Sequence, residues 1–377
     1  MHKFILTSFI LLSLPTLAQF GQSKLVDVNA RGITKIITLD INNDGLKDIA
    51  VAHGDFQQNL LSYYLNLGSG KFSSQQVLDS DVIKPNSLAT GDFNNDGWLD
   101  IVSFSGEFPG GELYIYLNNN STFDGRITID SITSADTYTD VLVSDIDNDN
   151  DEDLIVISHL ELMVFQNNGN AIFSKTTVAP GVSAENYSLT LGDIDANGFI
   201  DIIVGGVKTL IYSNNNGVLN FDSARTDFID NQFFNGLIFL TDLSDFDGDG
   251  DIDLLIGGAN QADLRWHKND GNGLFTLTQV FESGILECKS ITSKDLDNDG
   301  DIDVLTSYPQ TGRVVWYANN GEGEFGSANL IHQGEGPIFI NIISADDLTN
   351  DSYQDIIWSD KLSIHIANDE IFKTSFE

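Results

Sequence analysis

The chain has 377 residues, of which 56 are acidic and 18 are basic, and its formal net charge is −38 at pH 7. A charge of this sign repels phosphate backbones and anionic lipid surfaces, so we expect neither a nucleic-acid partner nor insertion into a membrane. The residues are nevertheless 41% hydrophobic and 10% aromatic, which is too apolar for a disordered acidic chain. The composition therefore predicts a folded protein.

Residues 1–18 have the pattern of an export signal. Lys3 supplies a positive charge, an apolar stretch follows it, and Thr16, Leu17 and Ala18 offer a small-residue cleavage site. This stretch is too short to span a membrane. We therefore expect the mature domain, residues 19–377, to be exported to the periplasm, the cell surface or the medium. Its single cysteine, Cys288, cannot form an intramolecular disulfide and is expected to be a buried apolar residue.

The mature region is dominated by a nine-residue acidic phrase that recurs seven times. Successive phrases begin 52, 53, 48, 52, 50 and 52 residues apart, and a fixed period near 50 residues is typical of repeats with one structural unit per period. The phrases are DINNDGLKD from Asp40, DFNNDGWLD from Asp92, DIDNDNDED from Asp145, DIDANGFID from Asp193, DFDGDGDID from Asp245, DLDNDGDID from Asp295 and DLTNDSYQD from Asp347.

Four short apolar or aromatic runs surround each phrase. In the first repeat, residues 36–39 precede the phrase, residues 48–51 follow it, residues 63–65 form an aromatic run, and Phe72 opens a fourth run after a turn. Runs of this length and composition, separated by turn residues, are typical of β-strands. Seven units of four antiparallel strands predict an all-β fold, a seven-bladed β-propeller, because closing the ring covers the exposed sheet ends.

The two ends of the chain indicate how the ring closes. Phe20 precedes Asp40 by 20 residues, as Phe72 precedes Asp92, so residues 20–28 have the pattern of a fourth strand without its first three. We infer that this N-terminal strand completes the seventh blade, beside residues 362–367. Alternatively, residues 372–376 form that outer strand and the N-terminus adds a fifth.

The phrase itself places oxygen-bearing side chains where a curled loop can wrap a cation. A calcium ion takes six to eight oxygen ligands from side chains and carbonyl groups, and Gly at position 6 permits the curl. Position 7 contributes only its backbone carbonyl, so its residue type is free. The expected ligands at positions 1, 3, 5, 7 and 9 are Asp40, Asn42, Asp44, Leu46 and Asp48; Asp92, Asn94, Asp96, Trp98 and Asp100; Asp145, Asp147, Asp149, Asp151 and Asp153; Asp193, Asp195, Asn197, Phe199 and Asp201; Asp245, Asp247, Asp249, Asp251 and Asp253; Asp295, Asp297, Asp299, Asp301 and Asp303; and Asp347, Thr349, Asp351, Tyr353 and Asp355.

Other interpretations of the phrase are weaker. An EF-hand needs Glu at position 12 and flanking helices, whereas position 12 is never acidic here and the flanks are strand-like. Magnesium demands strict octahedral geometry and retained water, which favours calcium. Seven phrases in register are difficult to explain as purely structural turns. We expect up to seven Ca²⁺ ions, bound most tightly by the loops from Asp245 and Asp295 and most weakly by the loop from Asp347, which has Thr349 and Ser352 at positions 3 and 6.

These phrases, their period and their flanking strands resemble the FG-GAP/VCBS repeat family, which includes the calcium-bearing propeller of integrin α chains. The resemblance covers about residues 20–372 and is closer to the secreted bacterial branch, with stretches such as LRWHKN at 264–269 and VVWYAN at 314–319. It implies that each loop joins the first two strands of a blade and binds calcium through positions 1, 3, 5, 7 and 9.

No local motif indicates catalysis. Six histidines are scattered along the chain, and none shares a local motif with Ser, Cys or a paired carboxylate that would indicate a nucleophile and its base. We expect a monomeric, non-catalytic binding or cell-adhesion module whose partner is an extracellular protein or a glycan. The alternative is a polysaccharide lyase or glycoside hydrolase built on the propeller.

The ring mouth, where loops lead into the first strands, is the expected recognition surface, with ordinary core packing as the alternative reading of the same residues. The candidates are Ile33, Pro85, Tyr138, Asn186, Ile238, Cys288 and Ile340, with Tyr187, Phe233, Phe234, Phe339 and the loop from Phe104 to Glu112.

Overall fold

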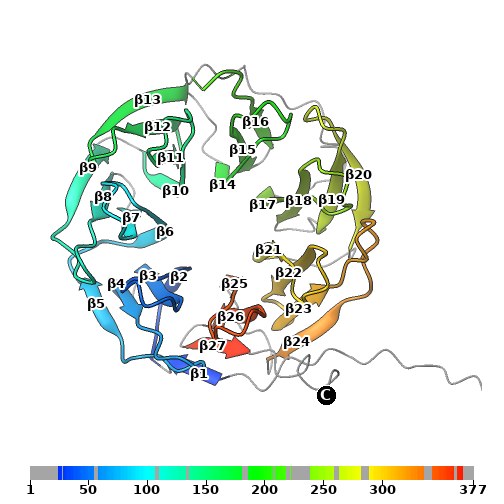
Figure 1. The fold of residues 1–377 in the computed structure, drawn as a ribbon, viewed down its shortest axis with the longest axis horizontal. Helices are drawn as coiled ribbons and strands as arrows, with labels where there is room; N and C mark the ends of the chain where they lie inside the picture. The colour runs from blue at the N-terminus through cyan, green and yellow to red at the C-terminus, as the bar shows by residue number, and fades with distance from the viewer. Residues whose placement is uncertain are drawn as a thin grey trace, which may run out of the picture.

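The computed structural model describes residues 24–27, 29–54, 58–106, 110–132, 136–180, 186–206, 209–217, 221, 238–258, 263–281, 288–334, 342–360 and 363–367. All regular structure in these ranges is β-strand, arranged as seven antiparallel sheets around a ring (Figure 1). The predicted seven-bladed β-propeller is confirmed. The export signal and residues 372–376 lie outside the described ranges.

Each blade begins with a strand that faces the centre of the ring (Figure 1). These inner strands mix buried and half-exposed residues, because one side borders the central channel. The inner strands are β2 (Ile33–Leu39), β6 (Pro85–Gly91), β10 (Tyr138–Ser144), β14 (Asn186–Gly192), β17 (Ile238–Ser244), β21 (Ser290–Lys294) and β25 (Ile342–Asp346).

The second strand of each blade is almost entirely buried. In the third blade, for example, all six residues of the second strand are buried, because neighbouring blades cover both of its faces. Near-continuous apolar runs are the expected sequence of such doubly covered strands. The second strands are β3 (Asp48–Gly54), β7 (Asp100–Ser105), β11 (Asp153–Ser158), β15 (Asp201–Gly206), β18 (Asp253–Gly258), β22 (Asp303–Tyr308) and β26 (Asp355–Ser359).

The third strands carry the aromatic runs, and the outer strands form the circumference (Figure 1). The third strands are β4 (Asn59–Tyr64), β8 (Gly111–Tyr116), β12 (Glu161–Asn167), β16 (Leu210–Tyr212), β19 (Arg265–Asn269), β23 (Arg313–Tyr317) and β27 (Ile364–Ala367). The outer strands are β5 (Gln76–Asp79), β9 (Ile127–Ile132), β13 (Phe173–Pro180), β20 (Phe275–Val280), β24 (Asn329–Gln333) and β1 (Lys24–Asp27). In the fourth blade the described part of the fourth strand is an isolated bridge between Asn214 and Phe221.

The N-terminal strand closes the ring. Strand β1 pairs antiparallel with β27, with Lys24 opposite Ile366 and Leu25 opposite His365. The Tyr64 hydroxyl of the first blade donates a 2.8 Å hydrogen bond to Asp27 Oδ2 on β1. The predicted N-terminal closure is therefore confirmed, and the last blade is linked to the first.

The hydrophobic core lies in the seams between blades. One seam packs Phe93 and Phe104 of the second blade against Leu154, Met163 and Phe165 of the third. Each seam has its own cluster of this kind, so the stability of the ring depends on contacts that join neighbouring repeats.

Candidate functional site: seven acidic loops and a central cavity

Each acidic phrase forms the loop between the first and second strands of its blade, as the sequence predicted. The first Asp organises this loop. The Asp40 carboxylate accepts hydrogen bonds from the backbone N–H groups of Asp44 and Gly45, at 3.1 and 2.8 Å. The equivalent carboxylate in the other six loops also accepts two backbone N–H groups, at 2.7–3.1 Å.

Two positions in every loop adopt the left-handed backbone conformation. At position 6, where Gly was expected, Asn150 and Ser352 adopt it as well, with φ of 72° and 73°. Position 4 has φ between 53° and 71° in all seven loops, a requirement that sequence reasoning missed. Its signal was present, because position 4 is Asn in five loops and Gly in a sixth, and both residues tolerate this conformation.

The Asp at position 9 anchors the loop to the blade. All seven are at most 1% exposed. In the first blade, Asp48 Oδ2 accepts the backbone N–H of Ile41 at 2.9 Å, and Oδ1 accepts that of Asn66 at 2.6 Å. Burial raises the pKa of these carboxyls, to about 8 for Asp303, about 7 for Asp100 and about 6 for Asp48. A nearby cation would favour their charged form.

The oxygen at position 3 indicates where such a cation belongs. In each of five loops, the buried side-chain oxygen at position 3 has no hydrogen-bond partner within the described part of the chain. Buried polar atoms rarely lack both a partner and a ligand. These atoms are Asp147 Oδ1, Asp195 Oδ1, Asp247 Oδ1, Asp297 Oδ1 and Thr349 Oγ1. In four loops, three carboxylates offer oxygens within 4.8 Å of one another. These residues fit a hard, oxygen-preferring cation such as calcium, which would neutralise their mutual repulsion.

The seven loops differ in how many of the expected carboxylate ligands lie close together. The four three-carboxylate groups use positions 1, 3 and 9 in the loops from Asp145, Asp193 and Asp245, and positions 1, 3 and 5 in the loop from Asp295. The loops from Asp40, Asp92 and Asp347 have Asn or Thr at position 3, so they offer fewer carboxylates. The backbone carbonyl at position 7 remains a prediction.

A lysine occupies part of the loop in the fifth blade. Lys268 Nζ forms ion pairs with Asp247 and, at 2.7 Å, with Asp249 Oδ2. These contacts raise the pKa of Lys268 and lower that of Asp249. The loop from Asp295 has no such lysine among its described contacts, so the two loops that the sequence ranked together differ.

In the described part of the chain, an asparagine at the end of the third strand connects six of the seven loops to the next blade. Asn118 Nδ2 in the second blade donates to the carbonyl oxygen of Ile41, at position 2 of the first blade's loop, at 2.8 Å. The sequence contains this signal as an Asn after each aromatic run, but its role was not predicted. The equivalent bonds, at 2.7–2.9 Å, join Asn66 to Leu348, Asn167 to Phe93, Asn214 to Ile146, Asn269 to Ile194 and Asn319 to Phe246.

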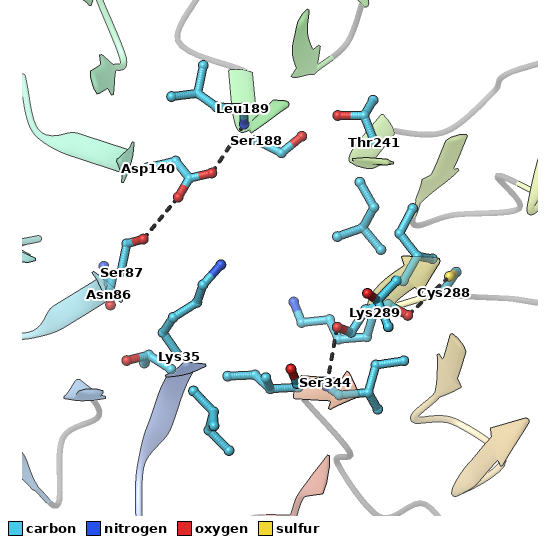
Figure 2. A pocket seen from close by; sticks show the side chains of 18 of the residues that line it. Lys35, Asn86, Ser87, Asp140, Ser188, Leu189, Thr241, Cys288, Lys289 and Ser344 are labelled. Carbon is cyan, nitrogen blue, oxygen red and sulfur yellow. Dashed lines mark hydrogen bonds between the residues drawn. The ribbon is translucent and has the colours of Figure 1, made fainter. Parts of the chain in front are cut away.

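The opposite mouth of the ring contains a cavity of about 580 Å³ (Figure 2). Four predicted recognition residues, Ile33, Pro85, Tyr138 and Cys288, are buried. Core packing accounts for the first three, whereas Cys288 also lines the cavity (Figure 2). The structure does not describe the side chains of the other individually named candidates. The rest of the lining lies one to four positions further along the chain than the candidates and includes Lys35, Ser87, Asp140, Ser188, Lys289 and Ser344.

One histidine–serine pair arises from the fold. His53 Nε2 lies 2.9 Å from Ser62 Oγ, and its Nδ1 lies 2.6 Å from the carbonyl oxygen of Arg31. Both side chains are at most 1% exposed. A substrate cannot reach them, so this pair is structural.

Comparison with known proteins agrees with this geometry. The family model described as FG-GAP-like repeat matches residues 40–103, 145–204, 245–306 and 295–358, and that described as FG-GAP repeat matches residues 85–129. The chain belongs to the FG-GAP repeat family. No curated protein sequence matches the chain.

Solved structures share the fold of this FG-GAP protein at low sequence identity. An Agrocybe aegerita lectin, described by its specific recognition of non-reducing terminal N-acetylglucosamine, is 18% identical, with a TM-score of 0.57 and coverage of 80% of this chain and 81% of the lectin. Two structures of BBS1N in complex with ARL6DN are 13% and 11% identical, with TM-scores of 0.60 and 0.63. They cover 93% and 94% of this chain and 98% of the other.

Proposed function

We propose that this protein is an exported, calcium-stabilised propeller that binds an extracellular glycan or protein without changing it chemically. The observation that carries the proposal is the separation of two features on one rigid ring. The acidic loops lie at the ends of the inner strands, whereas the cavity lies at their beginnings. The calcium loops thus support the scaffold and leave the cavity free for a partner.

Several further features support a binding role. The similar lectin and BBS1N structures are described with a sugar and a protein partner respectively. The described residues include no helix that is long and apolar enough to cross a membrane, and the strongly acidic composition argues against nucleic acid. The proposal includes export by residues 1–18 to the periplasm, cell surface or medium, and action as a monomer.

The alternative function is a polysaccharide-degrading enzyme. Among the described residues, the His53–Ser62 pair is buried, and the clustered carboxylates belong to the acidic loops. Neither arrangement offers an accessible nucleophile and base.

A glycan array, followed by lyase and hydrolase assays on every polysaccharide that binds, separates the two functions. We expect binding without turnover, in calcium and with chelator controls. Turnover that is abolished by substitution of a cavity residue would establish the enzyme instead.

A further inference from the structure

The central cavity concentrates positive charge in a strongly acidic protein. Lys35 of the first blade and Lys289 of the sixth both line it, and their side chains extend toward the same space (Figure 2). Neither ammonium group has a carboxylate within 4 Å among the described residues, although the whole chain has 56 acidic and only 18 basic residues. Two like charges beside one cavity repel each other, and a bound anion relieves that repulsion.

The only carboxylate among the cavity-lining residues is already held by protein donors. Asp140 Oδ1 accepts hydrogen bonds from Ser87 Oγ and the backbone N–H of Val141, each at 3.0 Å. Its Oδ2 accepts the backbone N–H of Leu189 at 3.1 Å. Asp140 thereby ties the second, third and fourth blades together, and its contacts do not include either lysine.

The remaining lining favours a ligand that also carries hydroxyl groups. The side chains of Asn86, Thr292 and Ser344 border the cavity and form no hydrogen bond within the described part of the chain. Leu240 and Ile342 add an aliphatic surface against which the C–H face of a sugar ring can pack. A cavity of about 580 Å³ is within the range of ordinary small-molecule sites.

The backbone builds this lining at the rim. A β-bulge interrupts the pairing of the inner strand between Ile33 and Lys35, between Tyr138 and Asp140, and at the equivalent place in three other blades. Bulges are common at the rims of closed sheets and beside binding sites, where they redirect a side chain. Two of these bulges end at Lys35 and Asp140, which both line the cavity.

We propose that this cavity binds an acidic sugar, a uronic-acid residue of a glycan, with Lys35 and Lys289 contacting its carboxylate and the polar lining contacting its hydroxyl groups. The inference rests on the proposed binding function and names its ligand class. An acidic protein segment could also meet the lysines, but the hydroxyl and amide lining favours a polyhydroxylated ligand.

The test is calorimetric titration of the calcium-loaded protein with oligogalacturonate, a glucuronate oligomer and a mannuronate oligomer. Each is compared with its methyl ester, which has the same shape without the charge. We expect at least one acid to bind and its ester to bind roughly tenfold more weakly or worse, since charge-assisted hydrogen bonds are lost. Raising the salt concentration should weaken binding of the acid but not binding of its methyl ester.

Variants locate the site. Lys35→Met and Lys289→Met should each reduce the affinity for the acid roughly tenfold, whereas Lys35→Arg should retain most of it. Lys71→Met, at an exposed lysine in the turn between β4 and β5, is the matched control and should change nothing. Melting temperatures of all variants show whether the fold is intact.

Several results would overturn the inference: no uronate oligomer binding at millimolar concentration, equal affinity for acid and ester, or unchanged affinity of the Lys35→Met/Lys289→Met double variant. Tighter binding of polyglutamate than of any uronate would replace the sugar with an acidic protein. Charge-independent binding of a neutral glycan or a protein would overturn the inference and leave the proposed binding function standing.

Discussion

Asn118 of the second blade and Ile41 of the first are joined by a buried 2.8 Å hydrogen bond from the asparagine amide to the isoleucine carbonyl oxygen. Ile41 is position 2 of an acidic loop, and its own N–H is bound by Asp48. The same amide group also donates to the carbonyl oxygen of Leu99 at 3.2 Å. One side chain therefore couples an acidic loop to the next blade.

Removing this amide should destabilise the ring. We expect Asn118→Ala to lower the free energy of unfolding by about 1–3 kcal/mol, because one buried and one partly buried carbonyl group lose a donor. Urea unfolding measures the change. Asn119→Ala, at the exposed neighbouring residue, is the control, and equal midpoints for the two variants would contradict the role of the amide.

The loop backbone predicts a difference between two glycines. A β-carbon would meet no atom within 4 Å at either Gly45 or Gly125, but only Gly45 has a positive φ, +86°. Gly45→Ala should therefore cost about 1 kcal/mol of stability or more through backbone strain alone, whereas Gly125→Ala should be nearly neutral. Thermal unfolding in saturating calcium compares them; similar losses would show that the conformation at position 6 is unimportant.

Lys268 should weaken calcium binding by the fifth blade. Its ammonium group lies against Asp247 and Asp249, so an incoming cation has to displace it. We expect Lys268→Met to increase the calcium affinity of this loop several-fold. The measurement is anomalous scattering at each loop of crystals grown in limiting calcium, with the Asp295 loop of the same molecule as the internal control. Unchanged relative occupancy would refute the competition.

Acid should destabilise the protein partly through His267. Burial lowers the pKa of this side chain to about 4, below the 6.5 expected in the unfolded chain. The unfolded state then binds more protons between these values, so this contribution to stability is present above pH 6.5 and is lost as the pH falls toward 4. It is on the order of 3 kcal/mol at most.

The check is the pH dependence of urea unfolding in His267→Gln and in the wild type. The variant should lose less stability than the wild type between pH 6.5 and pH 4. Parallel profiles for the two proteins would show that His267 does not drive the acid response. His159→Gln, at a histidine that is only partly buried, serves as the comparison.

Sequence reasoning recovered the features that repeat locally. The period of the phrases predicted seven blades, and the 20-residue spacing from Phe20 to Asp40 predicted closure by β1. The left-handed position 6 followed from its glycines, and Asn150 adopts the same conformation. The blade count and the position-6 conformation depend on residues close together in the chain, and the closing strand was recognised because it keeps the spacing of the repeat.

Side-chain contacts between separate strands and loops were not predictable in the same way. Lys268 meets Asp247 across 21 residues, and Asn118 meets Ile41 across 77, so no local period reveals either contact. On most inner strands the recognition surface was predicted a few residues too early, because bulges shift the side chains after Ile33 and Tyr138. A one-residue shift exchanges the two faces of a strand.

We propose that the acidic loops hold calcium and that this binding stabilises the ring. Thermal unfolding of the purified protein in chelator, and again after calcium is restored to millimolar concentration, is the decisive experiment. A ligand that binds only the folded state raises the melting temperature by mass action, so we expect a large rise with calcium and a much smaller one with magnesium. Superimposable melting curves in chelator and in millimolar calcium would contradict the account.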